Sequence, residues 1–245
     1  TGSPSPGGTP VATSSHPPPI ESRSLRTESI KSIMRAATSG TGQRTGVLRS
    51  RTADPLGAWD DLGPLYTGDG APPPGAPSDS GNVWAIDMTV GEVGGRLYAV
   101  WSGWERNAPT DKTVQHLYIA PMRDPATMAG PRRRLSSPTE PWERGPELPL
   151  QEGPEFLQRG GQTFLVYSTN DSWLPTYQLG MLRLRPGADP LDPASWTKTG
   201  PVFAPANGVL GVGHHTFTTS PDGREDWLVY HAKTSASPGW DRVIR

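Results

Sequence analysis

The stretch Gly94-Gly-Arg-Leu-Tyr-Ala-Val-Trp-Ser102 is a glycine turn followed by an apolar run that ends in a valine and an aromatic residue. The same pattern recurs as Gly160-Gly-Gln-Thr-Phe-Leu-Val-Tyr-Ser168 and as Asp222-Gly-Arg-Glu-Asp-Trp-Leu-Val-Tyr-His231. The equivalent aromatic residues are 66 and 63 residues apart. Each run follows another short strand-like segment, which predicts three hairpins whose glycines supply the positive φ that tight turns need.

Further strand-like segments follow each hairpin in the same register. Third strands are expected at 117–125 and 179–186, and at 45–55 ahead of the first hairpin; last strands are expected around Trp142, at 196–203 and at 59–66. Four short strands recurring every 60-odd residues are typical of a β-propeller with long loops, whereas a β-sandwich needs no fixed period. The sequence therefore predicts an all-β fold, a partial β-propeller with about three to four blades present.

The blades divide the chain unevenly. Blades are expected at 81–143 and 148–203, with another starting near 208 and only the outer strands of a first blade at 30–66. Residues 1–24 are rich in Pro, Ser and Gly, which predicts a linker or disordered segment ahead of an incomplete catalytic propeller at 25–245. We interpret the chain as a fragment, truncated at both ends.

Composition excludes several classes of protein. The 245 residues include 29 glycines and 29 prolines, roughly twice the average share, which disfavours long helices. No cysteine is present, so disulfide scaffolds, cysteine–zinc sites and cysteine nucleophiles are excluded. A net charge of −1 argues against nucleic acid or an anionic membrane as partner. The sequence contains no run of 18 apolar residues, which is the length needed to span a bilayer.

Three polar residues open the first strand of their blades. Asp87, Glu152 and His214 are spaced 65 and 62 residues apart, and the first strand of each blade lines the axis of a propeller. We therefore expect their side chains to converge on one axial pocket. Two carboxylates around one bond are what glycoside hydrolysis requires, and the charge of one can raise the pKa of the other.

Tryptophan side chains could stack on the rings of a sugar. Trp84, Trp101, Trp104, Trp142 and Trp173 are candidates, although propeller blades also use aromatic residues in their cores. Trp104 follows Trp101 by an odd spacing, so on a strand it points to the opposite face. We expect core packing for any other single tryptophan and sugar contact for Trp104.

Four ordered motifs together resemble glycoside hydrolase family 43, and most of all its exo-acting α-L-arabinofuranosidases. They are Trp84-Ala-Ile-Asp87, Leu97-Tyr-Ala-Val-Trp-Ser-Gly-Trp104, Glu152-Gly-Pro-Glu155 and Gly211-Val-Gly-His-His-Thr-Phe217. The resemblance extends from about residue 84 to 245 and, more weakly, over 45–65. It implies a five-bladed propeller that hydrolyses α-L-arabinofuranosides or β-D-xylosides with inversion and requires no cofactor.

The resemblance also implies roles for individual residues. Glu152 matches the general acid of the family and Asp87 the carboxylate that modulates the pKa of that acid. His214 matches an axial histidine that contacts substrate and, in many members, a bound calcium ion through water; the alternative is a hydrogen-bonded imidazole without metal. Trp84, Trp104 and Arg242 are expected to contact the substrate. His215 and Glu155 are expected on the opposite strand face from His214 and Glu152, in structural roles.

The general base is where the sequence departs from the family. Residues 1–53 contain no Asp, and Asp54 falls in register with Asp124 and Asp189 at strand ends far from the axis. Glu21 and Glu28 have no strand pattern around them, so we interpret the base as absent. Loss of a general base typically lowers the rate by roughly 10² to 10⁴, so we expect this polypeptide to have little or no activity.

The sequence thus predicts a secreted glycosidase that removes terminal α-L-arabinofuranosyl groups from plant cell-wall arabinan, arabinoxylan or arabino-oligosaccharides. Two alternatives remain open: a β-xylosidase of the same family, and a non-catalytic carbohydrate-binding propeller.

Overall fold

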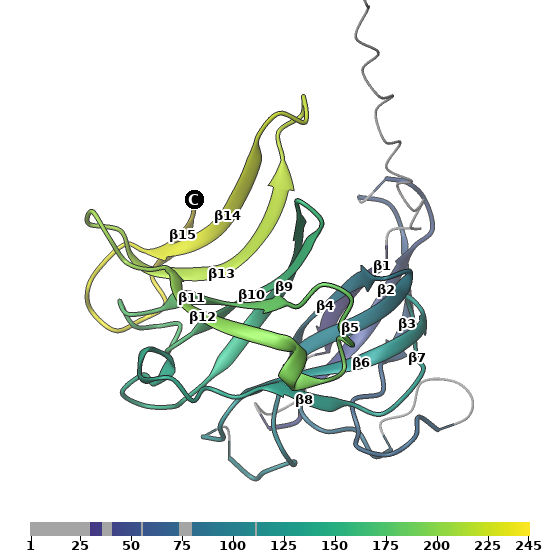
Figure 1. The fold of residues 1–245 in the computed structure, drawn as a ribbon. Helices are drawn as coiled ribbons and strands as arrows, with labels where there is room; N and C mark the ends of the chain where they lie inside the picture. The colour runs from purple at the N-terminus through teal and green to yellow at the C-terminus, as the bar shows by residue number, and fades with distance from the viewer. Residues whose placement is uncertain (1–29, 36–40, 55, 74–79, 111) are drawn as a thin grey trace, which may run out of the picture.

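A computed structural model describes residues 30–35, 41–54, 56–73, 80–110 and 112–245. The expected linker at 1–24 lies outside the described residues. The described chain forms four antiparallel sheets that follow one another from the purple to the yellow end in Figure 1. They confirm the predicted all-β fold and partial propeller.

Each sheet corresponds to one expected blade, with strands in sequence order. The first contains β1 (Ile30–Arg35), β2 (Arg44–Ser50) and β3 (Trp59–Pro64); the second β4 (Ala85–Val93), β5 (Arg96–Gly103), β6 (His116–Asp124), β7 (Thr127–Met128) and β8 (Arg133–Ser136); the third β9 (Gln151–Arg159), β10 (Gln162–Thr169), β11 (Gln178–Leu184) and β12 (Trp196–Phe203); the fourth β13 (Leu210–Thr219), β14 (Asp226–Lys233) and β15 (Arg242–Ile244).

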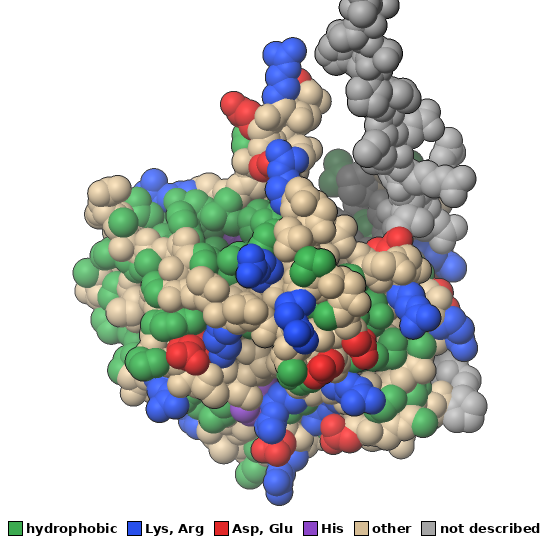
Figure 2. Space-filling view, in the orientation of Figure 1, with side chains coloured by type: hydrophobic (Ala, Val, Ile, Leu, Met, Phe, Trp, Pro, Cys, Tyr) green, Lys and Arg blue, Asp and Glu red, His purple; other side chains and the backbone are tan. Residues whose placement is uncertain are grey.

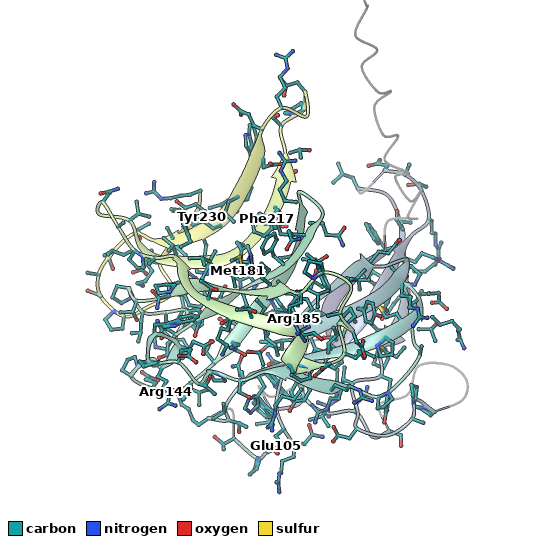
Figure 3. All side chains as sticks on the ribbon, in the orientation of Figure 1. Glu105, Arg144, Met181, Arg185, Phe217 and Tyr230 are labelled. Atoms are coloured by element: carbon teal, nitrogen blue, oxygen red, sulfur yellow. The ribbon has the colours of Figure 1, made fainter. Side chains whose placement is uncertain are left out.

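The repeated apolar run is continuous because its strand is buried on both faces. On β5, Ala99 and Trp101 pack into a core shared with the first sheet, whereas Tyr98 and Val100 pack into a core shared with the third. Side chains on a strand alternate between faces, so an inner blade needs apolar residues at every position. In the same way Tyr230 of β14, labelled in Figure 3, meets the ring of Phe203 on β12 at 4.8 Å.

The hairpin turns have the predicted form. Gly94 and Gly95 join β4 to β5 with φ of 58° and 76°, and Gly160 and Gly161 join β9 to β10 with φ of 58° and 73°. Two successive positive φ values define the tight turn that suits the twist of a hairpin, and glycine adopts them without strain. The third hairpin has a longer loop, in which Gly223 has a φ of 70°.

The outer edge of the second sheet differs from the prediction. There β7 and β8 both pair with β6, whereas Trp142 lies beyond them in the 3-10 helix η1 (Pro141–Glu143). The second 3-10 helix, η2 (Pro193–Ser195), leads into β12. None of the helices in the described ranges is both long and apolar enough to cross a bilayer. Basic and acidic side chains are interspersed on the face shown in Figure 2, in keeping with the balanced net charge.

A buried ion pair joins the η1 segment to the outer strand of the third sheet. Glu143 is fully buried, and its carboxylate lies 2.7 Å from Lys198 Nζ on β12. Tyr167 Oη and Gln151 Nε2 donate to the same carboxylate at 2.7 and 2.5 Å. A buried charge needs this degree of pairing because it has lost its hydration.

We expect Lys198→Met to destabilise the protein by on the order of 3–5 kcal/mol, because it leaves the Glu143 carboxylate buried without a counter-charge. The measurement is urea unfolding followed by tryptophan fluorescence. The matched control is Lys112→Met: the pair between Lys112 and Glu147 is 3.3 Å long but exposed, and its loss should cost about 0–1 kcal/mol. Equal losses in the two variants would contradict the role of burial.

Candidate active site

The innermost strand of each of the last three sheets carries a β-bulge at the same height. Between the pairs Ile86–Ser102 and Thr89–Val100, β4 contains one residue more than β5. The same single extra residue occurs in β9, between Glu152 and Glu155, and in β13, between Gly213 and Thr216. A bulge bends the strand and redirects its side chains, which is how these strand starts are turned toward one another.

The bulges place three residues in the left-handed region of the backbone. Asp87, Gly153 and His214 have φ of 54°, 53° and 46°, and each is the first of the two residues that oppose a single residue in its bulge. Asp87 is therefore structurally equivalent to Gly153. The sequence spacing instead indicates equivalence to Glu152. Glu152 precedes this position by one residue, so its side chain leaves the strand in a different direction.

Asp87 is held by the neighbouring blade. Its Oδ2 accepts a hydrogen bond of 3.1 Å from the backbone N–H of Gly153, and its Oδ1 lies 3.9 Å from His214 Nε2. Burial raises the pKa of Asp87, while His214 and the Gly153 N–H oppose that rise. The backbone N–H of His214 in turn donates to Ser168 Oγ at 2.8 Å, so three blades meet at this point.

Glu152 has the electrostatic environment of a proton donor. Its side chain is buried, and Tyr177 Oη donates to its Oε1 at 2.6 Å. Burial, and next the charge of Asp87, raise the pKa of Glu152 to about 7, against the opposing effects of Tyr177, His214 and Arg242. Two carboxylates whose environments favour protonation of one of them are the arrangement that general-acid chemistry uses.

A stacked pair of rings supports Tyr177. The ring of Tyr177 lies on His231 with centroids 5.3 Å apart and planes 3° apart, and Arg242 Nη1 lies 3.0 Å from His231 Nε2. Burial, Arg242 and His214 lower the pKa of His231 to about 4. Because a guanidinium only donates, His231 Nε2 is the acceptor, and the neutral ring fixes Arg242 beside the carboxylates.

Glu155 lies on the side of its strand that faces the neighbouring blade, not where the sequence predicted it. Strand alternation predicted that it faces away from Glu152 in a surface or structural role. Instead its Oε2 accepts a hydrogen bond of 3.2 Å from Thr89 Oγ1 of the neighbouring blade, and its pKa is raised by burial and influenced by His214 and Asp87. The extra residue of the bulge breaks the two-residue alternation, which is why counting along the strand failed.

The two tryptophans expected to contact sugar are core residues. Trp84 and Trp104 stack on each other with centroids 4.3 Å apart and planes 4° apart, and they are 3% and 0% exposed. Neither ring therefore offers a face to a ligand, contrary to the expectation from sequence. Arg132 is also buried: it donates to the backbone oxygens of Trp104 and Glu105 and fixes this loop.

The remaining carboxylate and histidine candidates that the structure describes make no hydrogen bond with Asp87 or Glu152. Asp54 lies in an exposed loop after β2, where its carboxylate accepts the N–H of Leu56. Glu21 and Glu28 lie outside the described residues. His215 is buried against the ring of Phe217, with centroids 5.0 Å apart.

The side chains around His214 do not form a set of direct calcium ligands. Calcium takes six to eight oxygen ligands, whereas no group of three or more His, Asp or Glu in the described part of the chain is arranged to hold a metal. Direct binding of calcium by these side chains is therefore not supported, and the expected contact of His214 with calcium through water stays a prediction.

Several known proteins with similar sequences are named as arabinofuranosidases. An extracellular exo-α-(1→5)-L-arabinofuranosidase of Streptomyces avermitilis is 38% identical over 192 residues, covering 77% of this chain and 36% of that protein. α-L-Arabinofuranosidase 43 of Humicola insolens is 34% identical, covering 77% of this chain and 37% of its own length. An extracellular exo-α-(1→5)-L-arabinofuranosidase of Streptomyces chartreusis is 32% identical over 194 residues, covering 78% and 54%. The chain thus spans about a third to a half of these relatives.

Solved structures agree on the fold. The α-L-arabinofuranosidase of Lactobacillus brevis superposes with a TM-score of 0.66 at 28% identity, covering 83% of this chain and 62% of that one. A thermostable family-43 glycoside hydrolase superposes with a TM-score of 0.70 at 24% identity, covering 88% and 65%. The four sheets match the blades of these five-bladed propellers. The sequence profile of the glycosyl hydrolases family 43 matches residues 31–245, and the chain belongs to this family.

Proposed function

We propose that this chain is the propeller part of an exo-acting α-L-arabinofuranosidase that cleaves terminal α-L-arabinofuranosyl linkages with inversion. The observation that carries the proposal is the buried Glu152, whose pKa is raised to about 7 beside Asp87. The names of the similar proteins support the arabinofuranosyl substrate. By the same reasoning we propose a secreted parent protein that acts on arabinan, arabinoxylan or arabino-oligosaccharides, with the segment before residue 25 as a linker.

In the proposed mechanism, Glu152 donates its proton to the glycosidic oxygen as the bond to the anomeric carbon breaks. Asp87 keeps the proton on Glu152 until that step by like-charge repulsion, and the Gly153 N–H keeps Asp87 in place. Water attacks the anomeric carbon from the opposite face and gives a proton to a carboxylate base, and the attack inverts the configuration of that carbon. This chemistry needs a carboxylate base but neither metal nor organic cofactor.

Two rival functions are separated by simple measurements. A β-xylosidase would release xylose from p-nitrophenyl β-D-xyloside in preference to arabinose from the arabinofuranoside. A non-catalytic carbohydrate-binding propeller would bind arabino-oligosaccharides without hydrolysing either compound. We favour a glycosidase over a binding protein because the buried and repelled Glu152 has a cost in stability that a binding protein has no need to bear. The names of the similar proteins favour the arabinofuranoside over the xyloside.

Glu152→Gln should lower hydrolysis of arabino-oligosaccharides by roughly 10² to 10⁴, because the amide cannot donate a proton to the leaving oxygen. The measurement is arabinose release, with binding of the oligosaccharide followed by calorimetry in parallel. Binding should survive within a few-fold, since the amide has nearly the shape of the acid. Asp54→Asn, at an exposed carboxylate, is the control and should match the unsubstituted chain. Unchanged hydrolysis in Glu152→Gln would refute the assignment.

Tyr177→Phe and Asp87→Asn should move the pKa of Glu152 in opposite directions. The Tyr177 hydroxyl stabilises the charged carboxylate, so its removal should raise the pKa above about 7. Asp87→Asn removes a repelling charge and should lower that pKa, although burial keeps it above 4.5. Carboxyl ¹³C NMR of glutamate-labelled protein measures both values without turnover. Shifts in the same direction would contradict the proposed electrostatics.

We further propose that these 245 residues hydrolyse substrate slowly because they lack a dedicated base. Among the described residues, the remaining carboxylate that acts on Asp87 and His214 is Glu155, which is already hydrogen-bonded to Thr89.

Azide needs no deprotonation before it attacks, so it should restore cleavage of p-nitrophenyl α-L-arabinofuranoside by about tenfold or more and yield the arabinosyl azide. The measurement is p-nitrophenol release with and without azide. Fast hydrolysis that azide does not accelerate would show that a base is present, and Glu155→Gln would then test whether Glu155 is that base.

A further inference from the structure

Two tryptophans on neighbouring loops form an aromatic surface at the edge of the site. Trp173 lies between β10 and β11, and Trp240 between β14 and β15. Their ring centroids are 5.6 Å apart with planes 50° apart. The core tryptophans Trp84 and Trp104 stack almost face to face, whereas these rings meet at an angle that leaves ring surface uncovered.

The loops that carry the pair are fixed to each other. The N–H of Gly239 donates to the backbone oxygen of Trp173 at 2.9 Å, across two blades. Lys233 is buried, and its Nζ donates to the backbone oxygen of Gly239 at 2.6 Å. Thr234 N–H donates to Asp241 O at 3.0 Å and closes the loop. The aromatic surface is therefore held in place before any ligand arrives, which lowers the entropy cost of binding.

Trp240 is 63% exposed, which is costly for the largest apolar side chain. The guanidinium of Arg242 lies 4.5 Å from the ring centroid, and the exposed area of the ring is open to a ligand. Lys112 lies 5.7 Å from the Trp173 ring and pairs with Glu147, which gives the surface a charged rim. An open ring face beside hydrogen-bonding groups suits a ligand with both C–H faces and hydroxyl groups.

Arg242 connects this surface to the proposed acid. The same guanidinium that lies on Trp240 is hydrogen-bonded to His231, and its charge acts on Glu152. Contacts lead from Trp240 through Arg242 and His231 to Tyr177, whose hydroxyl donates to Glu152, so the surface is connected to the acid. Glu152 gives its proton to the oxygen of the leaving group, so the acid's side of the site is the side on which the leaving group lies.

We infer that Trp173 and Trp240 form a binding subsite for a sugar ring on the leaving-group side of the scissile bond. The inference rests on the proposed function. It adds to that function a binding site for the leaving group, which is the oligosaccharide that remains when the terminal sugar is removed. The occupant is the penultimate sugar of an arabino-oligosaccharide, with its C–H face on the open ring of Trp240 and its hydroxyl groups toward the rim at Lys112.

The test is calorimetric binding of two probes, (1→5)-α-L-arabinotriose and methyl α-L-arabinofuranoside, to the 245-residue chain in the Glu152→Gln background. Trp240→Ala should weaken binding of the trisaccharide about tenfold and change that of the methyl glycoside less than twofold, because the monosaccharide does not reach the subsite. Trp240→Phe should restore part of the affinity. The control is Trp227→Ala, at a tryptophan that is 47% exposed on β14 and hydrogen-bonded to Glu225.

The outcomes separate this inference from the proposed function. Unchanged trisaccharide affinity in Trp240→Ala, or no trisaccharide binding by the unsubstituted chain, would overturn the subsite. Equal weakening of both probes would also overturn it, because it would place Trp240 at the terminal sugar. Trp240→Ala could weaken trisaccharide binding selectively while Glu152→Gln leaves the slow hydrolysis unchanged. That combination would support the subsite and refute the catalytic proposal. Thermal unfolding by circular dichroism checks that each variant is folded.

Discussion

The axial site depends on one hydrogen bond between blades, from the backbone N–H of Gly153 to Oδ2 of Asp87. The bulge directs this N–H out of its own sheet, and the φ of 53° that the bulge requires is one that glycine adopts freely. A Cβ at this position would make only van der Waals contact with the imidazole of His214, at 3.4 Å. Glycine therefore matters here for its backbone conformation, which turns the N–H toward Asp87.

Burial of the two carboxylates works against the stability of the fold. The folded-state pKa values of Asp87 and Glu152 are raised, so between the ordinary carboxyl pKa and about 7 the folded chain binds more protons than the unfolded chain. Stability contributed by these groups is present at low pH and is lost as pH rises through that window. The satisfied network around Glu143 and the apolar cores on both faces of β5 hold the strand starts in place against this cost.

The repeat in the sequence was sufficient to predict the sheets but not the details of the site. Apolar runs such as 97–101 mark strands buried on both faces, and paired glycines mark tight turns, so blade positions follow from local signals. A bulge has no comparable signal: one extra residue shifted the register of Glu152 and reversed the face of Glu155. Trp104 was misplaced for a related reason, because strand alternation was extended one residue past the end of β5, into a loop fixed by Arg132.

The environment of Glu152 combines opposing effects whose balance matters more than any one of them. Burial and Asp87 alone would hold the proton too tightly to release it to a leaving oxygen, whereas Tyr177 and Arg242 favour the charged form that remains after transfer. A pKa near the working pH is the compromise that general-acid catalysis needs. Arg242 is held by a neutral His231 and also covers one face of Trp240, so the group that lowers the acid's pKa shapes the proposed sugar surface as well. A substitution at Arg242 would therefore disturb proton transfer and substrate binding together. A substitution at Trp240 would change substrate binding without changing proton transfer.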